Sequence, residues 1–258
     1  MIYIAAPCYN GMSVHTSKAL LQCGRSKYDV VIQEQDYSIL CYNFNVMWCD
    51  MLNKRRSGED VRYFCMIHSD VNIVDDLIEG NWLDVFVDLL EEREVDVLSV
   101  VSPLKDNRGV TSTGIYDVEK EVIVKRLTMT EVKKLPQTFG IYDIYDDECS
   151  DVHSVGVYGK EKNKLVVNTG LMLVKVDDWC EKVFFHDKHY VLKVTDTETG
   201  VVTFIAQVVS EDWMFSVDVQ KLGMKVEATT KLAIEHIGKC GYGNYGVWGT
   251  LKEDDLSK

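Results

Sequence analysis

The stretch YFCMIHSDVNI, Tyr63–Ile73, joins an apolar run to three consecutive polar residues. Its first five residues are aromatic, aliphatic or sulfur-bearing, a pattern that predicts a buried β-strand. His68, Ser69 and Asp70 follow, so the strand ends in side chains that either turn into solvent or bind something charged. In open parallel sheets, ligands bind beyond the carboxyl ends of the strands. The meaning of this strand end therefore depends on the elements around it.

Segments with strand-like and helix-like patterns alternate on both sides of this stretch. Apolar runs at residues 1–7 and 28–35 precede it, and another at 95–103 follows it. Segments with apolar residues at helical spacing lie between these runs. Such alternation predicts an α/β fold in which helices cover both faces of a mostly parallel central sheet. The expected helices are at residues 14–23, 38–55 and 82–92, and the second of them places one apolar face toward the core, made of Leu40, Phe44, Met47, Trp48 and Met51.

The pattern is less regular from residue 105 to residue 165. This region contains the threonine-rich segment GVTSTG at 109–114, which we interpret as a turn, and an acidic segment at 141–151, which we interpret as an exposed loop. Strand-like and helix-like patterns return and continue to residue 228, and the glycine-containing tail from Gly241 predicts an irregular lid or arm. Because no linker or internal repeat interrupts the 258 residues, we expect a single domain.

The charge balance argues against a general nucleic-acid-binding surface. With 28 basic and 41 acidic residues, the chain has a formal net charge of −13, and such a surface repels phosphate backbones on average. The small basic cluster at residues 54–56 is either a local basic patch or a solvated helix end.

Cellular location is expected to be the cytoplasm. No apolar run approaches the roughly 18–20 residues that a membrane helix needs, and the N-terminal MIYIAAP shows no basic region of a signal peptide. The eight cysteines are scattered without CxxC pairs, and Cys41, Cys49 and Cys65 lie in apolar runs. These features predict reduced, buried thiols and no membrane partner.

Asp70 is a candidate metal ligand. Its carboxylate supplies the oxygen donors that Mg²⁺ and Mn²⁺ prefer, and His68, two residues earlier, supplies a nitrogen that favours Mn²⁺. A divalent ion at this position would bridge the phosphates of a nucleotide. A single aspartate at a strand end also serves as a turn or capping residue, so the interpretation needs support from elsewhere in the chain.

Support comes from SEDWMFS at 210–216 and EHIGK at 235–239. Glu211 and Asp212 lie at the start of an amphipathic segment. Paired carboxylates there either cap the free N–H groups of a helix or provide a general base near an acceptor hydroxyl. His236 is either structural or a further metal ligand.

Taken in order, these segments resemble those of nucleotide-sugar-dependent glycosyltransferases of the GT-A fold. HSD at 68–70 stands where those enzymes have an Asp-x-Asp metal motif, and EDWMFS resembles their acceptor-side motif. EHIGK resembles the late histidine that completes the metal site in some members. The resemblance covers most of the chain, and the sequences of these motifs are most similar to those of small glycosyltransferases of phages and bacteria. Two further segments contribute to it, PCYN at 7–10 after the first strand and NTGLMLVK at 168–175 on the sugar side.

The resemblance implies a GT-A-like fold in one domain, residues 1–258, whose successive segments bind different parts of the substrates. Residues 1–104 would bind the nucleotide, 105–240 would bind sugar and acceptor in a small subregion, and 241–258 would form a C-terminal arm.

The resemblance also implies roles for individual residues. Asp70 and His236 would hold Mn²⁺ or Mg²⁺, and His68, which replaces the usual first aspartate, would be a third ligand or would contact the ribose or a water. Asp212 or Glu211 would deprotonate the acceptor. The residues expected to bind the donor are Pro7, Tyr9, Gln33, Glu34, Ser38, Asn43, Lys105, Asn168 and Thr169.

The implied reaction moves a sugar from a nucleoside diphosphate, with UDP favoured, to an acceptor hydroxyl. The acceptor could be a glycan, a protein, a small molecule or a hydroxymethylated base in DNA. Two alternatives stay open, a non-catalytic nucleotide-sugar-binding protein and a sugar-phosphate nucleotidyltransferase. The latter is disfavoured because it needs a glycine-rich basic loop after the first strand, where PCYNGMSVHTSK has one glycine and no arginine.

Overall fold

The prediction of an α/β fold with a mostly parallel central sheet is confirmed. The computed structural model describes residues 1–8, 11–145, 162–197, 199–238 and 241–249 of the chain. The central sheet has seven strands in the order β2-β1-β3-β10-β5-β13-β8, and all run in one direction except β10 and β8. Its strands are β1 Ile2–Cys8, β2 Val30–Asp36, β3 Tyr63–Ile67, β5 Val97–Val100, β8 Thr138–Phe139, β10 Leu171–Lys175 and β13 Val226–Thr229.

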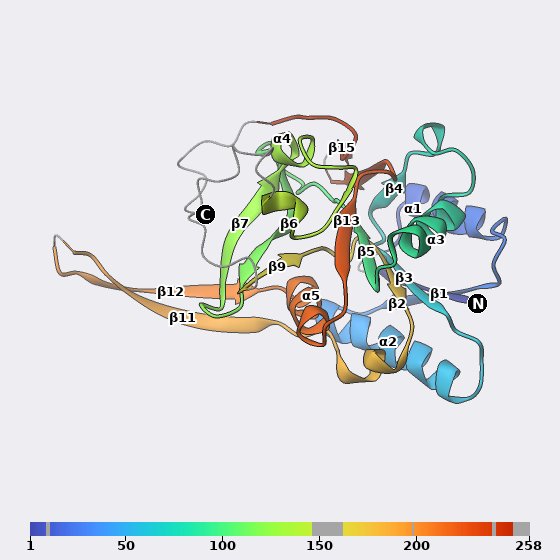
Figure 1. The fold of residues 1–258 in the computed structure, drawn as a ribbon, viewed down its shortest axis with the longest axis horizontal. Helices are drawn as coiled ribbons and strands as arrows, with labels where there is room; N and C mark the ends of the chain where they lie inside the picture. The colour runs from blue at the N-terminus through green and yellow to red at the C-terminus, as the bar shows by residue number, and fades with distance from the viewer. Residues whose placement is uncertain (9–10, 146–161, 198, 239–240, 250–258) are drawn as a thin grey trace.

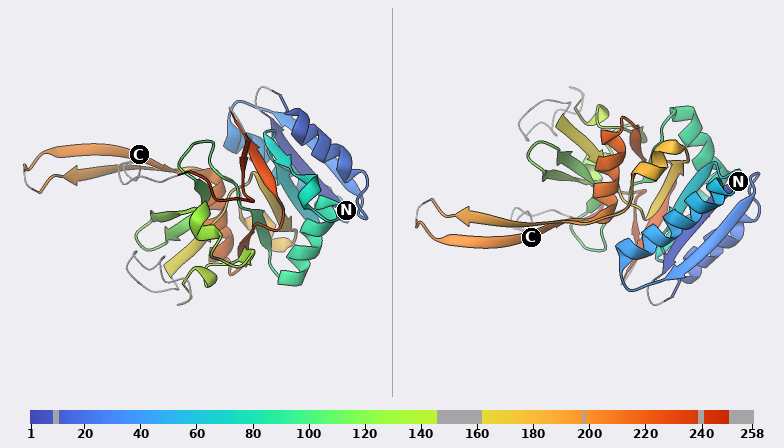
Figure 2. Two further views of the ribbon diagram at one scale, coloured as in Figure 1. Left: turned by 90° about the horizontal axis from the view of Figure 1, so that it is seen from above. Right: turned by 90° about the horizontal axis from the view of Figure 1, so that it is seen from below.

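Helices cover both faces of this sheet (Figures 1 and 2). Apolar residues of α1 and α3 pack with one set of alternating strand side chains, and apolar residues of α2 and α5 pack with the other set. Because alternate side chains of a strand point to opposite faces, both faces of the sheet are buried. The helices are α1 Val14–Cys23, α2 Leu40–Arg56, α3 Trp82–Arg93, α4 Met129–Val132 and α5 Glu211–Lys221, with 3₁₀ turns η1 Asp75–Leu77, η2 Asp143–Tyr145 and η5 Asp178–Lys182.

β10 joins the two halves of the chain into one sheet. It comes from the second half but lies between β3 and β5 of the first, and it pairs antiparallel with both. The strand ends of β3 and β5 therefore lie on either side of the loop that precedes β10.

Aromatic side chains fill the core between α2 and the sheet. Trp48 lies edge-on to Phe64, Phe185 and Phe215, with ring centroids 4.9, 5.8 and 5.4 Å away. Its Nε1 donates to the carbonyls of Cys180 and Val183, at 3.2 and 3.1 Å. Trp48 thus ties α2 to β3, to α5 and to the segment that follows η5.

We expect Trp48→Ala to be among the most destabilising single changes in the core. It removes a fully buried indole and leaves a large cavity, which costs about 3–5 kcal/mol. Urea unfolding of the variant beside the wild type measures the loss. Tyr42→Ala is the matched control, because Tyr42 is on the same helix but 53% exposed. A loss at Trp48 no larger than that at Tyr42 would contradict this assignment of the core.

Two three-stranded sheets flank the central one. The first pairs β4 Val71–Ile73 with β14 Ile234–Ile237 and β15 Gly241–Gly243. The second pairs β6 Val110–Asp117 with β7 Val122–Thr128 and β9 Asn163–Val166. The interpretation of GVTSTG as a turn was wrong, since most of it lies in β6. Threonine suits strands, and the hydroxyl of Thr111 donates to the carbonyl of Leu127 on the neighbouring strand at 2.8 Å.

A long hairpin, β11 Lys188–Thr195 and β12 Val202–Val209, projects from the rest of the molecule (Figures 1 and 2). The two strands pair only with each other, as an antiparallel sheet of their own. Its base is anchored by Val209, which packs in a small cluster with Trp213 and Tyr116.

Two expectations about side chains need correction. Leu40, expected on the buried face of α2, is 43% exposed because it lies at the first turn, beyond the sheet. Cys49, expected to be buried, is exposed on the outer face of the same helix, whereas Cys65 is buried and Cys41 is half-buried. The six cysteines within the described ranges are free thiols. No helix among the described residues is both long and apolar enough to cross a membrane.

Candidate functional site

Asp70 lies in the turn between β3 and β4, where the sequence predicted a ligand-binding strand end. The backbone N–H of Ile237 donates to its carbonyl at 2.8 Å, so strand β14 fixes the turn. The carboxylate forms a salt bridge with the ammonium group of Lys105 on one side, and on the other side its Oδ1 lies 3.4 Å from Nε2 of His236. Burial alone would raise the pKa of Asp70, but these two neighbours outweigh it and hold the pKa below its usual range. We call Asp70, Lys105 and His236 the Asp70 cluster.

The geometry of His236 leaves one nitrogen directed at Asp70. Its Nδ1 lies 2.9 Å from the carbonyl of Pro103, to which it can only donate. Oδ1 of Asp70 is itself buried, and no hydrogen-bond donor of the described chain satisfies it at this distance. With the proton on Nδ1 alone, Nε2 would present a lone pair to Oδ1, and a cation between the two atoms would satisfy both. With both nitrogens protonated, the imidazolium would itself pair with the carboxylate.

These two atoms form the minimum of a divalent-ion site. Nowhere in the described ranges do three His, Cys, Asp or Glu side chains gather closely enough to hold a metal ion by themselves. Mg²⁺ and Mn²⁺ at nucleotide sites commonly take one or two protein ligands, and substrate phosphates and water supply the rest. A metal-ligating histidine typically donates its other ring nitrogen to a carbonyl, as His236 does. The donor set therefore fits a metal ion that is held jointly with a diphosphate.

The imidazole of His68 contacts Thr169 and Phe44, and not Asp70 or His236. Its Nε2 lies 3.0 Å from the hydroxyl of Thr169, and its ring packs against Phe44 with centroids 5.3 Å apart. Its backbone N–H donates to the carbonyl of Gly170 at 2.8 Å. Burial lowers the pKa of His68 to about 4, so the imidazole is neutral at physiological pH. These contacts give His68 a role in holding the loop before β10 against the end of β3.

Asn168 and Thr169 are both buried in that loop. Nδ2 of Asn168 donates to the carbonyl of Val100 at 3.0 Å, and its Oδ1 accepts from the N–H of Gly170 at 2.8 Å. These bonds fix the loop to the end of β5. Thr169 lies beside His68, and contact of Asn168 or Thr169 with a donor stays a prediction.

Glu211 and Asp212 begin α5, as expected from the sequence. Oδ1 of Asp212 accepts from the hydroxyl of Ser210 and from the N–H of Trp213, the latter at 2.8 Å. Burial raises the pKa of Asp212, although these bonds and the charge of Arg126 oppose the rise. Asp212 therefore satisfies one free N–H of the first turn of α5, whose N-cap is Ser210.

Glu211 is the more strongly shifted carboxyl. Burial is the largest cause, and the nearby carboxylates of Asp212 and Asp187 add to it, so that its pKa is raised to about 8. A carboxyl with a pKa near neutrality can exchange a proton with a substrate at physiological pH. Two carboxyls whose environments differ in this way are typical of an acid–base pair.

The two halves of the site are joined by a continuous set of contacts. Nε1 of Trp213, on α5, donates to the carbonyl of Ser112 at 2.7 Å. Both the N–H and the hydroxyl of Ser112 donate to the carbonyl of Ser102 at 2.9 Å, just before the Pro103 that holds His236. The same helix reaches the loop before β10 through Ser216, whose hydroxyl accepts from the N–H of Val167 at 3.1 Å.

Several residues of the site were not predicted from the sequence. Asp187 precedes β11 and acts on Glu211. Arg126, on β7, places its guanidinium 4.2 Å from the centre of the Trp213 ring and its charge acts on Asp212. The hydroxyl of Ser102 is buried without a partner in the described structure. None of these stands in a recognisable motif, because only the fold brings them to α5 and to the end of β5.

The remaining predicted donor residues lie along β1, β2 and the start of α2. Pro7 is buried at the end of β1, and Asn43 is fully buried with its Nδ2 donating to the carbonyl of Gln35 at 3.0 Å. Ser38 is exposed in the bend before α2. Gln33 and Glu34 line a groove against α1. Tyr9 lies outside the described residues.

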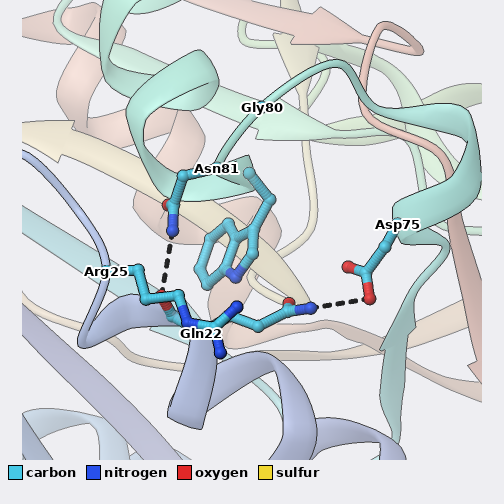
Figure 3. A pocket seen from close by; sticks show the side chains of 6 residues that line it. Gln22, Arg25, Asp75, Gly80 and Asn81 are labelled. Carbon is cyan, nitrogen blue, oxygen red and sulfur yellow. Dashed lines mark hydrogen bonds between the residues drawn. The ribbon is translucent and has the colours of Figure 1, made fainter.

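A separate cavity of about 290 Å³ lies between α1 and the start of α3 (Figure 3). Nε2 of Gln22 donates to Asp75 at 2.7 Å, and Nδ2 of Asn81 donates to the carbonyl of Gln22 at 2.9 Å. These bonds hold the two helices together. The sequence assigned no function to these residues.

Comparisons with known proteins give no family. No protein-family model and no curated protein matches the chain. Among solved structures, it is similar to the crystal structure of A197 from STIV, with 14% sequence identity, 92% of this chain and 85% of that chain covered, and a TM-score of 0.46. A likeness of this degree carries no argument about function.

Proposed function

We propose that the protein is a glycosyltransferase of GT-A type that transfers a sugar from a nucleoside diphosphate to an acceptor hydroxyl. The observation that carries the proposal is the unsatisfied Oδ1 of Asp70, which faces Nε2 of His236 beside the ammonium group of Lys105. This arrangement lies at the carboxyl end of a parallel strand, where open α/β sheets bind nucleotides. The carboxyl pair of α5 is connected to it through Ser112 and Ser102.

The donor would bind with its diphosphate at the Asp70 cluster. Asp70 and His236 would hold Mn²⁺ or Mg²⁺, and the ion supplies positive charge that stabilises the departing diphosphate. Lys105 would contribute a second positive charge once the phosphates draw it from Asp70. His68 and Thr169 would keep the loop before β10 in place beneath the sugar.

The acceptor would bind at the start of α5. Glu211, with its raised pKa, would take the proton of the attacking hydroxyl, and Asp212, fixed by Ser210 and Trp213, would orient that hydroxyl. Direct attack assisted by such a base inverts the configuration at the anomeric carbon.

The acceptor class is proposed to be a glycan, protein or small molecule, in preference to a DNA base. The basic cluster at residues 54–56 carries its own counter-charges, since Arg56 pairs with Glu181 and Arg55 with Asp177 and Asp178. Together with the net charge of −13, these pairs leave little local attraction for a phosphate backbone.

Ligand-dependent thermal stability tests the donor class. We expect UDP-sugars and Mn²⁺ together to raise the melting temperature more than either alone, because the ion and the diphosphate share one site. A ligand present at 100 times its Kd stabilises the folded state by about 2.7 kcal/mol. The screen compares UDP-, GDP- and dTDP-sugars with and without Mn²⁺, and EDTA is the control that removes the metal effect. Stability unchanged by every nucleotide sugar would contradict the proposal.

A further inference from the structure

The hairpin β11–β12 exposes apolar side chains that nothing in the described structure covers. One face of the hairpin carries Val191 and Phe204, which are 74% and 67% exposed. Val202 and Val208 lie on the same face, since residues paired across the strands share a face. The other face carries Val194 and Ile205, also exposed. Apolar residues on both faces are typical of a strand pair that is buried on both sides.

A two-stranded sheet is at best marginally stable in water without a surface to pack against. Each outer edge of this hairpin also presents backbone N–H and C=O groups, because β11 and β12 pair only with each other. Natural proteins avoid long apolar edges of this kind unless another chain uses them. The hairpin therefore has the features of an interaction arm.

The charge of the arm differs from that of the whole molecule. Its two strands contain Lys188 and Lys193 and no acidic residue, and the segment that joins them contains Asp196 and Glu198. The arm therefore has no net charge, whereas the chain as a whole has a net charge of −13. Lys188 pairs with Glu121 at the base of the arm, 2.7 Å away. Lys193 lies farther out, opposite Phe204. Lys193 thus places a positive charge on the apolar face that carries Phe204, and an acidic surface of another copy would complement it.

The body offers a surface of matching character at the edge strand β2. A groove of about 590 Å³ between β2 and α1 is lined by apolar side chains that include Leu21, which is 80% exposed, and Ile32, which is 40% exposed. Glu34 and Asp36 lie on the same side of β2, since they follow Ile32 at intervals of two residues. β2 is the outermost strand of the central sheet, so its free edge can accept another strand.

We propose that the arm of one copy docks on the β2 edge of a second copy, and that the chain forms a dimer through two such contacts. Phe204 and Val191 cover the apolar groove beside Leu21 and Ile32, and Lys193 lies against Glu34 and Asp36. The exchange is reciprocal, so each arm and each β2 edge is used and the assembly closes. The contact lies outside the Asp70 cluster, and it assigns the groove lined by Gln33 and Glu34 to the dimer in place of the donor contact that the sequence predicted for these two residues.

Sedimentation of the full-length chain over a series of concentrations tests this proposal. We expect the wild type to be a dimer and Phe204→Asp to weaken the dimer by at least about 30-fold, as loss of a buried aromatic anchor does. Leu77→Asp is the matched control, because Leu77 is 55% exposed on η1 and should leave the dimer unchanged. Far-UV circular dichroism checks that each variant is folded. A monomeric wild type, or a folded Phe204→Asp variant that dimerises like the wild type, would overturn the proposal.

A charge exchange tests where the arm docks. Lys193→Glu is expected to weaken the dimer about 10-fold through repulsion from the acidic edge. Adding Asp36→Lys in the same chain should restore most of the affinity, since the two charges are then exchanged. If the loss of dimer affinity in the double variant equalled the sum of the losses in the two single variants, docking on β2 would be overturned. A third outcome would also overturn the proposal. If the wild type were monomeric and bound phosphatidylserine vesicles, and Phe204→Asp abolished this binding, the arm would dock on a lipid surface and not on a second copy.

Discussion

Asp70→Asn is expected to abolish Mn²⁺-dependent transfer from a nucleotide sugar, with a loss in kcat/KM of at least about 100-fold. The change keeps the size of the side chain but removes the negative charge that attracts both the ion and Lys105. The amide also replaces one carboxylate oxygen by an N–H donor, so that Asp70 and His236 no longer offer an anionic oxygen and a ring nitrogen to one ion. Initial rates measured against Mn²⁺ concentration would reveal the defect as a lost or much weakened metal response.

The control for this experiment is Asp76→Asn, the same chemical change on an exposed residue six positions along the chain. It should leave both the rate and the metal response as in the wild type. The melting temperature of each variant without ligands separates a damaged site from a damaged fold. If Asp70→Asn turned over UDP-sugars at the wild-type rate with the same response to Mn²⁺, the proposed function would be wrong.

The regular elements of the fold could be predicted because their patterns are local. The helix expected at residues 14–23 is α1 with the same bounds, and the expected buried face of α2 is correct at Phe44, Met47 and Trp48. β6 was missed because its polar threonines look like a turn when read alone. Thr111 and Thr113 are buried in a strand whose partners, β7 and β9, come later in the chain.

The hairpin β11–β12 shows the limit of apolar pattern as a predictor of burial. β12 is mostly apolar, like the core strands, and β11 has apolar residues among its lysines, so their pattern alone does not indicate that they leave the body of the protein. The exposure of these side chains depends on where the two strands lie in the fold, which only the structure shows. The same mismatch between pattern and position is what supports an interaction role for the arm.

The candidate site was predictable where it depends on strand ends. Asp70 and Lys105 follow predicted strands, and parallel topology brings such strand ends together. His236 reaches Asp70 in a different way, because β14 pairs antiparallel with β4 directly after Asp70. The neighbours that set the chemistry of Glu211 were not predictable, because Asp187 and Arg126 reach α5 from distant elements. The roles of His68 and Asn168 in holding the loop before β10 likewise rest on tertiary hydrogen bonds.

Glu211→Gln is expected to reduce kcat by a factor of about 10²–10⁴, the usual contribution of a general base. The pH profile makes the assignment specific. Because the pKa of Glu211 is raised to about 8, the wild-type rate should rise about tenfold per pH unit below this value and level off above it. In Glu211→Gln this rise should disappear, while binding of the nucleotide sugar and Mn²⁺ should persist. Asp212→Asn should lower the rate but keep a rising profile, since Asp212 orients the acceptor.

The same group should appear in the pH dependence of stability, with a sign that follows from the direction of the shift. The folded state favours protonated Glu211, so its stabilising effect is complete below the unfolded pKa, near 4.5, and is lost as pH rises through about 8. Relative to Glu211→Gln, the wild type should lose up to about 1.4 kcal/mol per pH unit across this interval. Urea unfolding at several pH values measures the difference, and Glu79→Gln, at an exposed position, is the control. A constant difference between wild type and Glu211→Gln from acid to alkaline pH would show that the pKa of Glu211 is not raised in the folded protein, and the pH–rate profile expected above would then be wrong.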